Sequence, residues 1–227
     1  MLEPKMANQT KQDFQFTLSK VSHEIRNPLT LINSYLQLVE KAHPEVEEYE
    51  YWDDILDQMD FLKKLLGELS IYNNSRELHK EPIHIASYLK KLTEKLAPTY
   101  KYLGIDLNYE NYLLDANAIL YLDKIKFQQA LLNLIRNAGE SIAKNGTIHI
   151  ISRNQRDNLC IQIADNGCGI EPEHLPTLFD PFITHKKTGT GLGLAIVKQV
   201  VKAHDGSVEV TSYPNEGTTF TLLFPYA

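Results

Sequence analysis

Apolar residues in the first third of the chain recur at every third or fourth position, and this spacing constrains the fold more than any other feature. The first run comprises Phe14, Leu18, Val21, Ile25, Leu29, Ile32, Leu36 and Val39, and the second comprises Trp52, Ile55, Met59, Leu62, Leu66 and Leu69. Such spacing places each run on one face of an α-helix. The polar stretch between them, residues 41–50, contains Pro44 and several acidic residues. We therefore predict a helical hairpin.

A single helical hairpin covers only one side of each apolar run. Two hairpins that pack together form a four-helix bundle, which buries the rest of both runs. We therefore predict that this segment is an all-α domain that forms a homodimer.

The pattern changes after about residue 74. Helices are predicted over residues 84–102, 123–144 and 192–203, and strands over residues 105–109, 118–122, 147–152, 159–164, 207–212 and 218–224. Asp123 is a suitable N-cap for the central helix, and Gly146 is expected to end it. One mixed sheet with helices on one face is an α+β two-layer sandwich. The predicted domains are residues 1–76 and 82–227, joined by a linker at 77–81.

Composition excludes several classes of protein. The 227 residues carry a net charge of -6 without a block of basic residues, which argues against a nucleic-acid partner. The two cysteines, Cys160 and Cys168, match no disulfide framework and no common zinc pattern, so a reducing compartment is expected. No apolar run is long enough to span a membrane. We expect this fragment to be cytoplasmic, and its opening residues leave open an upstream region that anchors the full-length protein in a membrane.

The first candidate for chemistry is the histidine in SHEIRNPL, residues 22–29. His23 lies two positions past Val21, which places it roughly 200° around the helix and away from the apolar face. A lone histidine there is most often a simple surface residue. However, Pro28 removes the helical hydrogen-bond partner of the Glu24 carbonyl and predicts a bend near the ring. A neutral imidazole is a nucleophile near neutral pH, and Glu24 could take or hold its proton.

The second candidate is NLIRNAGES, residues 133–141, on the predicted central helix. Asn133 and Asn137 are one turn apart on one helical face. Asparagine is a poor choice for a helix interior, so the pair is expected to have a purpose. Amide oxygens suit a hard cation such as magnesium, although a buried structural pair is the alternative.

Two glycine-rich segments follow. In DNGCGI, Asp165 offers a carboxylate, while Gly167 and Gly169 allow a sharp turn and a close approach to a ligand. In GTGLGL, residues 189–194, glycines open a helix whose free N–H groups could hold a phosphate. Each segment alone is also compatible with an ordinary turn or loop. Neither the Walker pattern nor the dinucleotide fingerprint is present.

Together these motifs resemble the catalytic core of a bacterial two-component sensor histidine kinase. SHEIRNPL resembles the H box of that family, NLIRNA the N box, DNGCGI the G1 box, FDPFITHKK (residues 179–187) the F box and GTGLGL the G2 box; EGTTF, residues 216–220, also fits. The resemblance extends from about residue 12 to the end of the chain. Within the family, the sequence is most similar to the kinases that start sporulation phosphorelays.

The resemblance implies a fold and a reaction. The first domain would dimerise and carry the phosphoacceptor His23, and the second would bind ATP as in gyrase, mismatch-repair ATPases and one class of chaperones. The phosphoryl group would pass from Mg-ATP to His23 and then to an aspartate of a response regulator. Asp165 would bind the adenine amino group, Asn137 the magnesium ion, and Lys186 or Lys187 the phosphates, and Phe179 to Gly189 would form a mobile lid over the nucleotide. The implied nucleotide-binding residues are Asn133, Asn137, Asp165, Gly167, Gly169, Lys186, Gly189, Thr190, Gly191, Leu192 and Gly193.

Several points stay open within the resemblance. Glu140 occupies a position where many family members carry a basic residue. Glu24 and Asn27 match the E-x-x-N form that in this family supports dephosphorylation of the partner, although Asn27 could equally be a plain surface residue. Protein inhibitors of the kinase are a further class of partner. The rival functions are an ATPase-driven clamp and a nucleotide-binding scaffold without transfer. Most other histidines, namely His43, His79, His84, His174 and His204, are expected to be surface or capping residues.

Overall fold

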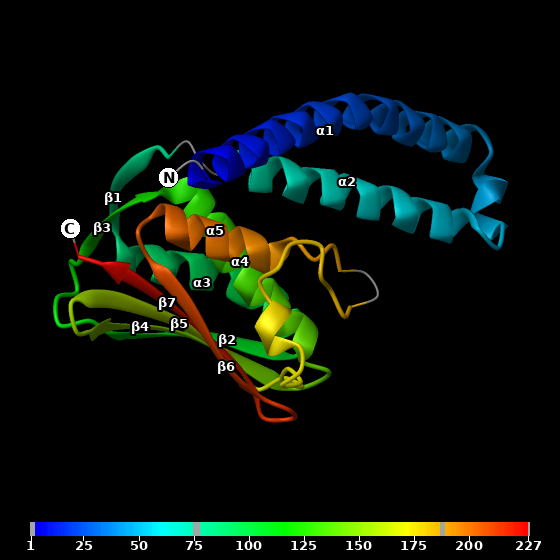
Figure 1. The fold of residues 1–227 in the computed structure, drawn as a ribbon. Helices are drawn as coiled ribbons and strands as arrows, with labels where there is room; N and C mark the ends of the chain where they lie inside the picture. The colour runs from blue at the N-terminus through cyan, green and yellow to red at the C-terminus, as the bar shows by residue number, and fades with distance from the viewer. Residues whose placement is uncertain (1–2, 75–77, 187–188, 227) are drawn as a thin grey trace. The chain divides into compact units, whose positions relative to one another are not determined.

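The structure is a computed structural model that describes residues 3–74, 78–186 and 189–226, with side chains described from Ser22 onward except those of His23 and Asn74 (Figure 1). Contacts divide the chain into two compact units. The first consists of Met1–Asn74 with Thr184–Leu192, and the second of Ser75–Ile183 with Gly193–Ala227. Within the described residues, no helix combines the length and the apolar character that a membrane span requires.

The first unit contains the predicted helical hairpin. Helix α1 (Glu3–Ala42) is followed by the 3-10 helix η1 (Pro44–Glu48) and by helix α2 (Trp52–Asn74). Leu29 from α1 packs with Met59 and Leu66 from α2, and Leu36 packs against this cluster. These residues belong to the two apolar runs, so helical periodicity predicted the contact face correctly.

The second unit is the predicted layer of helices on a mixed sheet. Its helices are α3 (Ile85–Tyr102), α4 (Lys124–Ser141), η2 (Leu175–Thr177) and α5 (Gly193–Ala203), and its strands are β1 (Lys80–His84), β2 (Ile105–Tyr112), β3 (Ile119–Asp123), β4 (Gly146–Gln155), β5 (Asn158–Asp165), β6 (Ser207–Tyr213) and β7 (Gly217–Pro225). Five strands form the main sheet in the order β2-β4-β5-β7-β6. Only β2 and β4 run parallel; the other neighbours are antiparallel.

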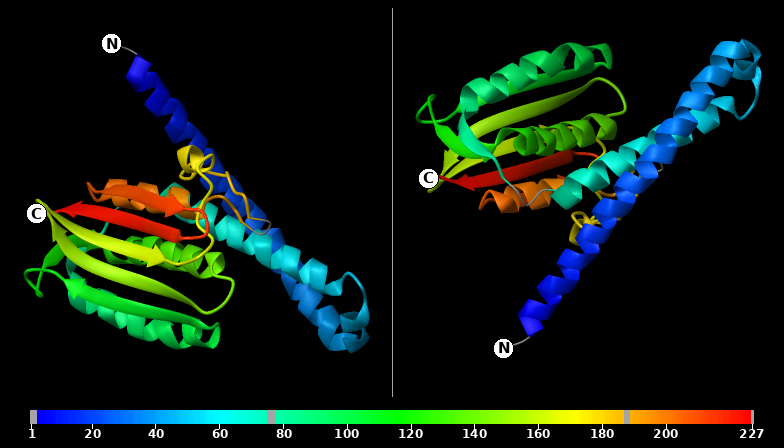
Figure 2. Two further views of the ribbon diagram at one scale, coloured as in Figure 1. Left: turned by 90° about the horizontal axis from the view of Figure 1, so that it is seen from below. Right: turned by 90° about the horizontal axis from the view of Figure 1, so that it is seen from above.

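Helices α3, α4 and α5 all cover the same face of this sheet (Figures 1 and 2). Alternate residues of β4 are buried, as expected for a strand with one covered face. The aromatic ring of Phe127 on α4 lies at the centre of the core. It meets Phe224 of β7 edge-on at 5.8 Å and Tyr88 of α3 at 5.6 Å. Long-range aromatic contacts therefore join two helices and the sheet.

Two local features differ from the sequence prediction. Strand β1 was not predicted; it pairs antiparallel with β3 in a separate two-stranded sheet. It contains Pro82 and only one buried residue, Ile83, so its own sequence carries little strand signal. In addition, α4 ends at Ser141 rather than near residue 144, and Gly146 begins β4 instead of capping the helix.

Candidate functional site

Helix α4 presents a polar face beside its buried one. Its N-cap is Asp123, whose side chain accepts a hydrogen bond from the backbone N–H of Lys126 at 3.1 Å. The predicted N-cap is therefore confirmed. Three large apolar side chains of α4, Phe127, Leu131 and Leu134, are fully buried. Asn133 and Asn137 are half-buried at the edge of this face, so their amides border the core without lying inside it.

Asn133 connects α4 to the beginning of α5. Its side-chain Nδ2 donates to the Gly193 carbonyl at 3.2 Å, and its Oδ1 accepts from Arg136 at 3.0 Å. The Arg136 side chain also lies 3.8 Å from the carboxylate of Glu140. Asn133 therefore positions the first residue of α5, which is also the last glycine of GTGLGL.

Arg136 was missed as a site residue, although NLIRNA contains it. Its spacing of three residues from Asn133 was the available signal, because residues i and i+3 are neighbours on a helix. Many family members carry a basic residue at the position of Glu140. In this chain Arg136 supplies a positive charge one turn earlier on the same helix, and Glu140 partly neutralises it.

Asp165 lies at the end of β5 and its carboxylate is held in place. Its Oδ1 accepts from the backbone N–H of Gly167 at 2.9 Å and lies 3.0 Å from the hydroxyl of Ser141, the last residue of α4. The side chain is half-buried. The carboxylate is therefore oriented by a loop N–H and by the central helix, a usual arrangement for a group that recognises a ligand.

The loop after Asp165 has no room for side chains at its glycines. A Cβ on Gly167 would lie 1.9 Å from the Ser141 hydroxyl, and one on Gly169 would lie 2.1 Å from the Tyr213 carbonyl oxygen. Gly169 also has a φ of 69°, which favours glycine. Hydrogen bonds from Cys168 N to Ser141 O (3.0 Å) and from Asn215 N to Cys168 O (2.7 Å) tie the loop down. The backbone path here is closely constrained.

Phe179 begins the segment expected to form the lid, and it lies on the second unit. Its ring meets Phe220 of β7 edge-on at 6.2 Å, and the Lys198 ammonium group lies 5.7 Å from its centre. These contacts fix the start of the lid to the sheet and to α5.

The later part of the lid, from Thr184 to Gly189, belongs to the first unit together with the residues that follow it as far as Leu192. The Thr190 hydroxyl donates to the buried Glu68 carboxylate of α2 and accepts from Leu192 N at 3.3 Å. Gly189 N donates to Lys186 O at 3.2 Å, and Gly191 has a φ of 71°. Lys187 lies outside the described residues. The expected phosphate contacts of Lys186, Gly189, Thr190, Gly191 and Leu192 stay predictions.

The histidine-containing segment lies on α1, which continues through Pro28 as one helix. Ser22 is buried, whereas Glu24 and Asn27 are exposed. The side chain of His23 lies outside the described residues, so its predicted exposure stays a prediction. The hydroxyls of Thr30 and Ser34 donate to carbonyls four residues earlier at 2.9 and 3.0 Å, contacts that often accompany helix bending.

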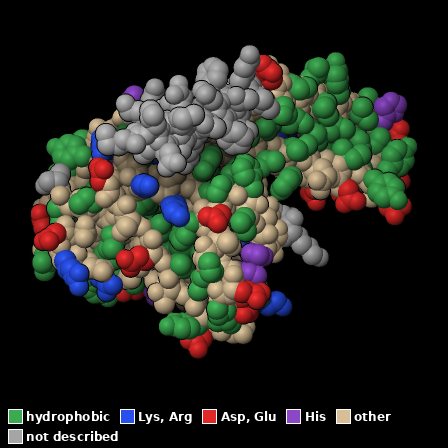
Figure 3. Space-filling model, viewed as in Figure 1, with side chains coloured by type: hydrophobic (Ala, Val, Ile, Leu, Met, Phe, Trp, Pro, Cys, Tyr) green, Lys and Arg blue, Asp and Glu red, His purple; other side chains and the backbone are tan. Residues whose placement is uncertain are grey.

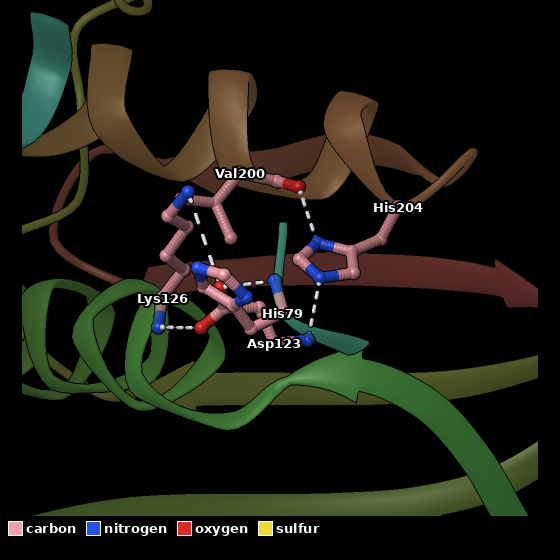
Figure 4. Close-up of polar contacts among 5 residues, drawn as sticks. All are labelled: His79, Asp123, Lys126, Val200 and His204. Carbon is pink, nitrogen blue, oxygen red and sulfur yellow. Dashed lines mark hydrogen bonds and ion pairs between the residues drawn. The ribbon is translucent and has the colours of Figure 1, made fainter. Parts of the chain in front are cut away.

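His204 was expected to be a surface or capping residue, and the surface alternative is wrong because the side chain is buried. Its Nε2 accepts from Asp123 N at 2.8 Å, and its Nδ1 lies 2.8 Å from Val200 O, so Nδ1 carries the proton (Figure 4). Burial lowers the pKa of His204 below its ordinary value, and nearby Lys80 and Lys126 lower it further. Sequence reasoning did not foresee this burial because Asp123, which His204 contacts, lies 81 residues earlier in the chain.

The Asp123 carboxylate completes this cluster. It accepts from His79 N at 3.0 Å as well as from Lys126 N, and the Lys126 ammonium group lies 3.9 Å away (Figure 4). Burial alone would raise the pKa of Asp123, but these backbone hydrogen bonds bring it below its usual value. The cluster joins the end of α5, the beginning of α4 and the residue before β1.

The amide of Asn137 on α4 is a suitable ligand for magnesium. Within the described residues, no group of three or more His, Cys, Asp or Glu side chains could hold a metal ion by itself. Magnesium in nucleotide sites usually takes only one or two protein oxygens, with phosphates and water supplying the rest. The half-buried Asn137 amide fits that requirement.

Comparison with known proteins places both units in one family. Residues 15–76 match the His Kinase A (phospho-acceptor) domain, and residues 122–227 match the histidine kinase-, DNA gyrase B-, and HSP90-like ATPase domain. The signal transduction histidine-protein kinase AtoS of Escherichia coli is 32% identical over 92% of this chain and 34% of its own length. Sporulation kinase A of Bacillus subtilis is 32% identical over 90% of this chain and 33% of its own length.

A solved structure of a related fold supports this family assignment. Full-length ShkA in complex with AMPPNP has a TM-score of 0.77 and 25% sequence identity, covering 93% of this chain and 46% of that one. The chain spans about a third of the length of AtoS and of sporulation kinase A.

Proposed function

Because the chain belongs to the sensor histidine kinases and carries both domains of their catalytic core, we propose that it transfers the γ-phosphoryl group of ATP to His23. From there the group passes to an aspartate of a response regulator. The observation that carries this proposal is the Asp165 carboxylate, held by Gly167 N and placed next to Ser141 of the helix that bears Asn133 and Asn137.

Each part of the second unit has a role in this proposal. The Asp165 carboxylate accepts a hydrogen bond from the adenine amino group, and the tight loop at Gly167 and Gly169 holds that carboxylate in position. Asn137 offers its amide oxygen to magnesium, whose charge neutralises the phosphate oxygens when the ion is bound. The AMPPNP complex of ShkA, a protein with a similar fold, supports ATP as the nucleotide.

The transfer itself needs mainly alignment. A ring nitrogen of neutral His23 forms the bond to the γ-phosphorus, while the bond from that phosphorus to the bridging oxygen breaks and ADP leaves. Glu24, the exposed neighbour on α1, takes or holds the proton of the other ring nitrogen. The Glu24–Asn27 pair also suits a partner-phosphatase activity, in which Asn27 would orient a water molecule toward the phosphoaspartate.

Dimerisation accounts for the apolar side chains that one hairpin leaves exposed. Ile25 and Ile32 on α1 are 44% and 46% exposed, and Ile55 on α2 is 43% exposed, although all belong to the predicted apolar runs. Figure 3 shows apolar side chains gathered over this hairpin. A second copy would cover them in a four-helix bundle.

The response regulator is identified only by class. Similarity to sporulation kinase A supports a sporulation phosphorelay, but AtoS is equally similar, so the sporulation role rests on the resemblance within the motifs. Protein inhibitors that dock on the hairpin would be further partners. ATP as the substrate supports a cytoplasmic location for this core, with any membrane anchor outside it.

Incubation with γ-labelled ATP and magnesium tests the proposal. We expect acid-labile, alkali-stable label on the protein, lost in His23→Gln and retained in His43→Gln, which removes another histidine from the same hairpin. Phosphate release without labelled protein would instead indicate a clamp-type ATPase. Nucleotide binding without either product would indicate a scaffold. Either outcome would contradict the kinase assignment.

A further inference from the structure

A groove lies between β1, the first half of α3 and the beginning of α4, elements that meet in the second unit (Figure 1). Its volume is about 420 Å³, within the range of small-molecule sites, roughly 300–1,000 Å³. At their C-terminal ends the two helices approach closely, since a Cβ on Gly139 would lie 2.7 Å from the Tyr100 ring. The groove lies at their N-terminal ends and shares no residue with the site around Asp165.

The groove is positively charged in an acidic protein. Lys91, Lys95 and Lys124 line it together with one acidic residue, Glu81. Glu81 lies 3.8 Å from Lys124, whereas Lys91 and Lys95 form no ion pair with any described residue. Three positive charges and one negative charge leave a surplus of two positive charges here, while the whole chain carries -6. Lys91 and Lys95, one turn apart on α3, form an attractive position for an anion.

The backbone adds to this charge. Residue His84, which lines the groove, is the N-cap of α3 but makes no side-chain capping hydrogen bond. The 18-residue helix therefore begins at the groove without a side-chain acceptor for its first N–H groups. The positive end of the helix dipole therefore lies at one end of the groove, and Lys91 and Lys95 lie six and ten residues further along the helix.

Tyr88 lines the groove and carries a buried polar atom, its hydroxyl, without a hydrogen-bond partner among the described residues. Burial raises the pKa of Tyr88 to about 12, so the hydroxyl stays protonated and can only gain from a nearby acceptor. Pro82, Ile83 and Leu92 supply apolar surface beside it. The lining thus combines cationic groups with an apolar wall, and a tyrosine with an unused hydroxyl lies in that lining.

We propose that this groove is a second ligand site, separate from the nucleotide site, that binds a small organic phosphate. The phosphate group lies against Lys91 and Lys95, and the organic part lies against the apolar wall. The small volume of the groove and the two neighbouring lysines favour a small molecule over a protein segment, which would need a longer surface. A ligand there would contact both α3 and α4, and α4 carries Asn133 and Asn137.

Titration of the isotope-labelled full-length chain with inorganic pyrophosphate tests this site at low salt, without ATP, which as an organic phosphate would compete for the groove. Backbone amide signals of Ser87, Lys91 and Gln128 report on the groove, and that of Gly167 reports on the nucleotide loop. We expect saturable shifts of the groove amides in the millimolar range or below. In Lys91→Gln/Lys95→Gln the apparent dissociation constant at these amides should rise at least about tenfold.

Lys90→Gln/Lys101→Gln is the matched control, since it removes the same charge from α3 at residues that do not line the groove. Glutamine keeps the helix propensity of lysine, so all variants should fold. The control should bind pyrophosphate at the groove as the parent does, and the Gly167 signal should be unaffected in both variants. Absence of saturation, or equal weakening in the two double variants, would overturn the site.

Discussion

Replacement of His204 by phenylalanine tests how the second unit holds its helices together. His204 is buried at the end of α5, where its Nε2 accepts from Asp123 N at 2.8 Å and its Nδ1–H faces Val200 O at 2.8 Å. Phenylalanine fills a similar volume but can neither accept nor donate. His204→Phe therefore leaves the Asp123 N–H buried without its partner, at the N-cap of the helix that carries the asparagines.

The expected cost follows from that single unsatisfied donor. A buried N–H without a partner costs about 1–3 kcal/mol, whereas a buried apolar ring costs nothing comparable. A loss of about 2 kcal/mol in the local opening free energy makes hydrogen exchange of the Asp123 amide roughly 30-fold faster. Exchange of one amide is the suitable assay, because unfolding of a chain with two units is not a single transition.

The same contact predicts that the stability of the second unit depends on pH. Burial lowers the pKa of folded His204 below its ordinary value, and in the unfolded chain that value is about 6.5. The unfolded state therefore binds a proton first as the pH falls. The stability that His204 contributes is fully present above about pH 6.5 and is lost progressively below it. His204→Phe should lack this component, so its exchange rates, corrected for intrinsic chemistry, should vary less between pH 7.5 and 5.5.

His79→Phe is the matched control. Its side chain is exposed, and its backbone N–H still donates to Asp123 Oδ2, so the Asp123 amide should exchange within about threefold of the parent rate. If His204→Phe matched this control in rate and in pH dependence, the imidazole would not be the acceptor that holds Asp123, and the reasoning would be wrong.

Three further predictions concern the proposed kinase. Gly167→Ala should weaken ATP binding at least about tenfold in calorimetry, because the new Cβ would lie 1.9 Å from the Ser141 hydroxyl. Gly67→Ala is the control, because a Cβ there meets no atom within 4 Å; it should leave ATP binding unchanged and stabilise α2 by about 0.5–1 kcal/mol. Ile32→Glu should convert the dimer to a monomer in sedimentation equilibrium, because the dimer would bury two unpaired charges at its interface. The exposed residue Gln37 supplies the control, and Gln37→Glu should leave the dimer intact. A dimer that persists in Ile32→Glu would exclude the Ile32 face of α1 as the interface. Asn137→Ala should abolish labelling as completely as chelation of magnesium does; label that survives in the variant would remove Asn137 from the metal site.

Local patterns were sufficient for most of the architecture. The two apolar runs predicted α1 and α2 because helical periodicity is a property of neighbouring residues. Asp123 was identified as an N-cap from its position before an amphipathic segment, and the glycines around Asp165 from their short spacing. Strand β1 escaped prediction because it is held by β3, about 40 residues away, rather than by its own composition.

The roles of particular side chains depended on the tertiary structure. Asn133 is recognisable in the sequence as an unusual helical residue, but its hydrogen bond to Gly193 reaches a residue 60 positions away. His204 looked like a surface residue until α5 placed it against Asp123, which lies 81 positions earlier. The charged groove likewise exists only because β1, α3 and α4 converge. The sequence by itself determined the helical hairpin, the layered domain and the family motifs, since these depend on periodicity and spacing between near neighbours. Only the folded chain decided which polar groups are buried, paired or gathered into a site, because those properties arise from contacts between residues far apart in the sequence.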